Sequence, residues 1–195
     1  MGYLNLPYQS RLLAYDDEST PIKLSGLKML PILEHDSKIM NESLDIMEFL
    51  DKKNILKISE LKQKSEFRAF EQTLNLMGNP IHSLAMPYWI YTPEFTETSR
   101  IYFQKKKELK RGPFKDLVKR RHEFILELRP MLKQIEDQLD PYYQSKKLGL
   151  YDILLAAHLW GLYVVPEFQF SEKIHQYLQQ VKSDCNFDYH QDFWS

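Results

Sequence analysis

The clearest alternation of apolar and polar positions lies between residues 28 and 51. A short apolar run follows Pro31, polar residues from His35 to Ser37 interrupt it, and a second short apolar run follows. From Asn41 onward, apolar residues recur at helical spacing, at Leu44, Met47 and Leu50. This pattern predicts two short strands joined by a tight turn, and then a helix that begins at Asn41-Glu42-Ser43.

After residue 53 the pattern is helical, with cap and stop signals between the apolar stripes. We expect helices at the following places: Ser59 to a stop at Gly78-Asn79-Pro80, Thr96 to Lys110, Pro113 to Leu139 with a kink at Pro130, Ile153 to Val165, and Ser171 to Lys182. The Ile153–Val165 segment is apolar nearly all round, which is typical of a central buried helix. Residues 186–195 form an aromatic tail that we expect to pack back onto the protein.

The pattern therefore predicts a small α/β region over residues 1–53 and an all-α region over residues 54–195. A polar connector, Lys52-Lys53-Asn54, separates them. With 195 residues, 43% of them hydrophobic, the chain can bury a substantial core.

Composition narrows the classes of partner. The net charge of −1 gives no reason to expect nucleic acid or an anionic membrane as a partner, and no apolar run is long enough to span a bilayer. The six histidines show no paired ligand spacing, so no metal site is expected. A single cysteine fits a reducing compartment, and we expect a cytoplasmic protein.

Residues around the predicted turn suggest a site for an extended peptide. Leu30 precedes Pro31 and is pushed toward extended geometry, where a cis bond would present its N–H and C=O to a ligand. Ser43, in the first turn of a helix, could bind a carboxylate, and Glu42 could accept from an ammonium group. The alternative is a helix capped by Asn41 whose acidic and hydroxyl residues serve stability alone.

These motifs together resemble a known family. Leu30-Pro31, the hairpin and Glu42-Ser43 resemble the second half of a glutathione transferase N-terminal domain, and most of all the glutaredoxin 2 family. The resemblance continues through segments that follow that family's helical domain in order: Met86-Pro87, Pro93-Glu94-Phe95, Arg100 to Phe103, Lys106-Lys107-Glu108 and Gly112-Pro113-Phe114.

The resemblance implies an α+β, mostly α fold. An incomplete thioredoxin-like domain over residues 1–53 would be followed by an all-α, glutathione-transferase-like domain over residues 54–195. Within the first domain, Tyr8 to Leu13 would form a strand and Asp16 to Pro21 a loop. Within the second, Asp152 would stabilise the start of the buried helix, although Gly149 stands where the family has Ser or Thr.

The same resemblance implies that the ligand is glutathione. Its site would be formed by Leu30, Pro31, Glu42 and Ser43. Protein disulfides are a further class of partner that the resemblance allows.

The catalytic chemistry of that family has no counterpart in this sequence. The family's Cys-Pro-Tyr-Cys motif would align before Met1, and the one cysteine, Cys185, matches no family position and is expected to be a passive thiol. We therefore expect no catalytic residue in residues 1–195. The Tyr8–Leu13 strand would lack its partner strand, which leaves three alternatives in this order: the sequence is a truncated version of a longer protein, the strand is displaced or paired differently, or another chain supplies the missing edge.

Three functions stay open. The first is a glutathione-dependent thiol-disulfide oxidoreductase whose catalytic segment lies upstream of Met1, so that the chain is truncated and inactive as it stands. The second is a non-catalytic glutathione- or protein-binding module. The third is a helical interaction domain with a vestigial first part.

Overall fold

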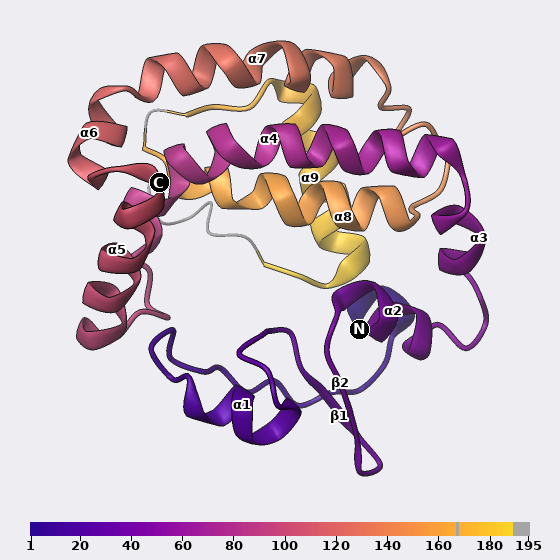
Figure 1. The fold of residues 1–195 in the computed structure, drawn as a ribbon. Coiled ribbons are helices and arrows are strands. Elements are labelled where there is room, and N and C mark those ends of the chain that lie inside the picture. The colour runs from indigo at the N-terminus through magenta and orange to yellow at the C-terminus, as the bar shows by residue number, and fades with distance from the viewer. Residues whose placement is uncertain (167, 189–195) are drawn as a thin grey trace.

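The computed structural model describes residues 1–166 and 168–188, and it confirms the predicted fold class (Figure 1). A small, sparsely packed N-terminal region contains one two-stranded sheet, and the rest is helical. The elements, in chain order, are η1 Gly2–Leu4, α1 Ser19–Ser25, β1 Leu33–His35, β2 Lys38–Met40, α2 Ser43–Leu50, α3 Ile58–Lys62, α4 Ser65–Trp89, α5 Glu97–Arg111, α6 Phe114–Lys119, α7 Arg121–Asp137, α8 Leu150–Leu159, η2 Trp160–Val164 and α9 Glu172–Cys185.

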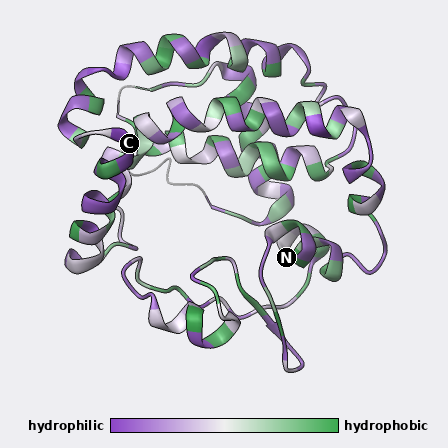
Figure 2. Cartoon of the chain, in the orientation of Figure 1, coloured by the Kyte–Doolittle hydropathy of each residue, from purple (hydrophilic) through white to green (hydrophobic). Residues whose placement is uncertain are grey.

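The helical core is built around α4, which packs against α6, α7, α8 and η2. Figure 1 shows α4 lying between α7 and α8, with α5 and α6 closing one end. One stripe of α4 supplies fully or nearly fully buried side chains, among them Leu74, Met77, Ile81 and Leu84. Figure 2 shows the same division by hydropathy, since α8 is largely hydrophobic whereas α5 and α7 carry long hydrophilic stretches.

The predicted stop at Gly78-Asn79-Pro80 is wrong, because α4 continues through Pro80 to Trp89. Proline removes one backbone donor and normally breaks a helix. Here the buried face continues on both sides of Pro80, through Met77 and Ile81, and burial of that face favours an uninterrupted helix.

The predicted long helix from Pro113 is two helices, α6 and α7, that meet at Arg120. α7 includes Pro130 without a break, and the interruption of the predicted helix falls at Arg120, ten residues before the predicted kink. Thr96 caps α5 and Ser171 caps α9, since each side chain accepts a hydrogen bond from a backbone N–H in the first turn of its helix.

The central buried helix is confirmed as α8, with its last turn continued as η2. Asp152 lies in the first turn of α8 and is 1% exposed. Its carboxylate accepts from the backbone N–H groups of Gly149 and Tyr143, both at 2.8 Å, and from the Tyr177 hydroxyl at 2.9 Å.

The N-terminal region departs from the sequence prediction in two places. Tyr8 to Leu13 forms no strand, and Tyr8 and Leu12 are 60% and 79% exposed, because no strand among the described residues offers this segment a partner. The predicted Asp16–Pro21 loop contains the start of α1, where the Asp17 carboxylate accepts from the Thr20 N–H at 2.9 Å. Pro21 is tolerated there because it lies in the first helical turn.

Part of the predicted aromatic tail lies outside the described residues, which end at Asp188. Phe187 does contact the protein, with its ring 6.1 Å from that of Trp160.

Candidate functional site

The hairpin brings the predicted ligand-binding residues to one end of the small sheet. In the antiparallel register of β1 and β2, Leu33 lies opposite Met40. Leu30-Pro31 lies just before Leu33 along the chain, and Glu42-Ser43 lies just after Met40. Both pairs therefore leave the sheet at the same end, away from the Asp36-Ser37 turn.

The side chain of Asn41 joins the loop before Pro31 to the start of α2 by hydrogen bonds. Its side-chain amide donates to the carbonyl of Met29 at 3.3 Å and to the hydroxyl of Ser25 at 3.1 Å. Met29 directly precedes Leu30, so this contact holds the loop before Pro31 against the start of α2. Asn41 is therefore a bridge and makes no cap for α2, contrary to the simplest interpretation of its position.

Glu42 has an unusual backbone conformation. Its φ is +68° and its ψ is 109°, a conformation that side chains with a Cβ rarely adopt. The Glu42 side chain is exposed, and so is that of Ser43, the first residue of α2. Within residues 1–166 and 168–188, neither the Glu42 carboxylate nor the Ser43 hydroxyl has a hydrogen-bond partner, so both are available to a ligand.

Leu30 is an exposed residue at the same place, with a relative exposure of 57%, and the Leu30-Pro31 bond is cis. The Glu42 carboxylate, the Ser43 hydroxyl and the positive end of α2 lie with this exposed segment, and together they suit a short peptide with a free amino-terminal end.

A polar cluster ties the loop before this site to the helical region. Lys28 donates to the Tyr102 hydroxyl of α5 at 2.8 Å and pairs with Glu18, which also accepts from Tyr102. The hydrogen bonds from Lys28 and Tyr102 lower the pKa of Glu18. Sequence analysis missed this cluster and the bridge by Asn41, because both depend on contacts between segments far apart in the chain.

Cys185 is the one cysteine of the sequence and ends α9. It is half-buried beside an apolar cavity of about 360 Å³, with Tyr3, Met47 and Trp160 among its neighbours. Burial, and then the nearby Asp184, raise the pKa of the Cys185 thiol to about 11. A thiol with such a pKa is protonated at neutral pH and is a poor nucleophile.

No group of three or more His, Cys, Asp or Glu side chains in the described residues is arranged to hold a metal ion. Among residues 1–166 and 168–188, no helix combines the length and apolar character needed to cross a lipid bilayer.

Comparison with known proteins gives consistent matches along the chain. Residues 69–192 match the model of the glutaredoxin 2 C-terminal domain, and residues 1–55 match that of the glutathione S-transferase N-terminal domain. Glutaredoxin 2 of Escherichia coli K12 is 29% identical over 181 residues, which cover 90% of this chain and 83% of that protein.

A solved structure is also similar to this chain. Glutaredoxin 2 from Salmonella typhimurium, crystallised in complex with glutathione, superposes with a TM-score of 0.85 at 26% identity. The match covers 100% of this chain and 90% of the other.

Proposed function

The chain belongs to the glutaredoxin 2 family, and on this premise we propose that residues 1–195 bind glutathione without catalysing disulfide exchange. Glutathione would lie with its backbone along Leu30-Pro31. Its γ-glutamyl carboxylate would bind Ser43 and the start of α2, and its ammonium group would bind Glu42. The observation that carries the proposal is the hairpin register, which brings both residue pairs to one end of the sheet.

The proposed lack of catalysis rests on the number of cysteines in this sequence and on the protonation of the one that is present. Dithiol exchange needs an activated thiolate and a resolving cysteine. The sequence contains one cysteine, and burial keeps its thiol protonated. The same proposal divides the chain into a first domain over residues 1–53 and a second domain over residues 54–195. The first domain would bind glutathione, and the second would support the first.

Glutathione bound by this set of groups should have a Kd in the millimolar range or weaker, about −4 kcal/mol. The test is a ligand-observed NMR titration on the wild type and on Glu42→Gln/Ser43→Ala, which should abolish the signal because each change removes the partner of one charged end. Glu34→Gln/Ser10→Ala is the matched control, since it removes one carboxylate and one hydroxyl from exposed positions elsewhere. Equal signals from the wild type and Glu42→Gln/Ser43→Ala would show that Glu42 and Ser43 do not bind glutathione and serve only the start of α2.

Catalysis is tested separately with the glutathione-dependent reduction of a hydroxyethyl disulfide adduct. We expect no turnover by the wild type or by Cys185→Ser. Turnover that Cys185→Ser abolishes would show that the thiol is reactive after all, and turnover that survives it would overturn the chemistry proposed here.

A further inference from the structure

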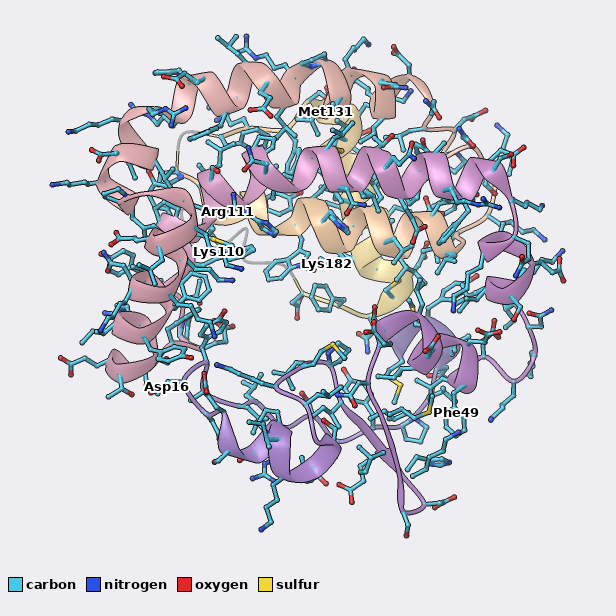
Figure 3. The ribbon with its side chains drawn as sticks, in the orientation of Figure 1. Asp16, Phe49, Lys110, Arg111, Met131 and Lys182 are labelled. Carbon is cyan, nitrogen blue, oxygen red and sulfur yellow. The ribbon has the colours of Figure 1, made fainter. Side chains whose placement is uncertain are left out.

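A second group of polar side chains lies away from the hairpin, where the C-terminal end of α5 meets the middle of α4. Arg111 is the last residue of α5, and Figure 3 shows it beside α4. Its Nη1 donates to Asn79 Oδ1 at 2.9 Å and to Ser83 Oγ at 3.3 Å, and its Nη2 lies 3.3 Å from His82 Nδ1.

All of these partners of Arg111 are neutral. The partly buried guanidinium makes no ion pair with a carboxylate of residues 1–166 and 168–188, and burial lowers its pKa. A guanidinium has five N–H donors in a planar fork, so some of these N–H groups take no part in the contacts described. A partly buried cation whose partners are neutral is unusual, because burying a charge without a counter-charge is costly.

The surroundings of this guanidinium are also basic. Burial, and then the positive charges of Arg111 and of Lys107 of α5, lower the pKa of His82 to about 4. The imidazole of His82 is therefore neutral and can accept from Arg111. Helices α4 and α5 thus bring three basic side chains close to one another.

An unsatisfied donor lies next to this cluster. The indole ring of Trp89 is 6.1 Å from the His82 ring, and its buried Nε1 has no hydrogen-bond acceptor among residues 1–166 and 168–188. The ring cannot easily turn away, because it stacks on Trp160 and lies against Gly161, where an added Cβ would be 2.4 Å from the indole. Buried polar groups without partners are rare in proteins, and one beside a basic cluster indicates a missing acceptor.

We propose that Arg111, with Asn79, Ser83 and His82 around it and Lys107 nearby, forms a binding site for an oxyanion carried by a small molecule, such as a carboxylate or phosphate group. The fork of Arg111 matches the geometry of such groups, which supply the charge and the acceptors that this place lacks. The site is distinct from the proposed glutathione site at Leu30-Pro31 and Glu42-Ser43 and does not depend on it.

The test uses sulfate, a dianion over the whole working range, and follows the indole N–H signal of Trp89 by NMR. The chain has three tryptophans, and Trp89→Phe identifies the signal. Sulfate should shift this signal saturably in the wild type. Arg111→Gln should weaken binding by about tenfold, since it removes a charge-assisted contact.

Two further variants keep the result interpretable. Lys107→Gln leaves every hydrogen bond of Arg111 in place, and it should still weaken sulfate binding by about threefold through the lost charge. Lys105→Gln, an exposed change of equal charge on the same helix, should leave binding unchanged. If Arg111→Gln fails to fold, the contrast between these two lysine variants decides the question.

Acetate distinguishes the two sources of the oxyanion. Saturable shifts with sulfate alone assign a phosphate-like group, and saturable shifts with acetate assign a carboxylate. A shift that rises linearly with both salts, and equally in wild type, Lys107→Gln and Lys105→Gln, would show a general salt effect and overturn the proposal. Because Glu42→Gln/Ser43→Ala should bind sulfate normally, this site and the glutathione proposal can fail independently.

Discussion

Helices α2 and α8 both begin beside an acidic side chain, yet the two acids have opposite surroundings. Asp152 of α8 is 1% exposed and accepts from two backbone N–H groups and one tyrosine hydroxyl. Glu42 at the start of α2 is exposed, has a φ of +68° and accepts no hydrogen bond from the described residues. The first acid has its partners within the fold, and the second has acceptors left for a partner from outside.

The contrast extends to the regions that hold the two helices. Few side chains of residues 1–53 are buried, with Ile46 of α2 and Asp51 as the main examples, whereas α4, α7, α8 and α9 share a continuous core. Stability should therefore reside in the helical region, while the small region presents groups for binding. Exposed, incompletely satisfied positions on a rigid support are where ligand sites are commonly found.

The sharpest test of this comparison is Asp152→Ala. It would leave the Gly149 N–H, the Tyr143 N–H and the Tyr177 hydroxyl without their acceptor in a buried place, and it should lower the free energy of unfolding by about 3 kcal/mol or more. The measurement is urea denaturation followed by circular dichroism. Glu42→Gln is the control, because it removes no contact and should change stability by less than about 0.5 kcal/mol. An unchanged midpoint for Asp152→Ala would contradict the structural role given to this acid.

The pH dependence of stability sharpens the same assignment. Burial raises the pKa of Asp152 above 3.8 and outweighs the hydrogen bonds that lower it. Between pH 3.8 and the raised native pKa, the folded state binds the proton more readily than the unfolded state does. The unfolding free energy of the wild type minus that of Asp152→Asn should therefore increase as the pH falls through this window. A difference that shrinks toward acid pH would mean that the hydrogen bonds dominate.

The two helix starts also show what could be predicted from sequence. Both helices and both acids are recognisable from apolar spacing and from residue types at the helix start, and the buried α8 is confirmed. The bridge by Asn41 is not predictable, because it depends on a contact with the loop before Pro31, and no residue type at the start of α2 indicates the positive φ of Glu42. Pro80 shows the same limit in the helical region, since its local stop signal is overridden by the buried face of α4.

Asn41→Ala tests whether the small region is held in its binding geometry by this bridge. Loss of the contacts to Met29 and Ser25 should cost about 1 kcal/mol of stability and should weaken glutathione binding by about threefold, although Asn41 itself is assigned no contact with the ligand. Ligand-observed NMR and urea denaturation measure the two effects. Gln9→Ala, which removes an exposed amide from the irregular segment, should change neither. Full glutathione affinity in Asn41→Ala would show that the hairpin alone fixes the site.

Glu42→Gly should produce the smallest change in stability and the most direct evidence about the difference between the two acids. Glycine adopts positive φ without the steric cost that a Cβ imposes, so the variant should be more stable than the wild type by about 0.5–1 kcal/mol. It should at the same time lose glutathione binding, because the carboxylate is gone. Glu34→Gly provides the control of opposite sign, since Glu34 lies in the extended backbone of β1, where glycine weakens a strand. A variant that is more stable but no longer binds glutathione would show that the Glu42 side chain lowers the stability of the fold and is needed for binding. A destabilised Glu42→Gly would mean instead that the Glu42 side chain supports the fold, as Asp152 does, and the distinction between the two helix starts would disappear.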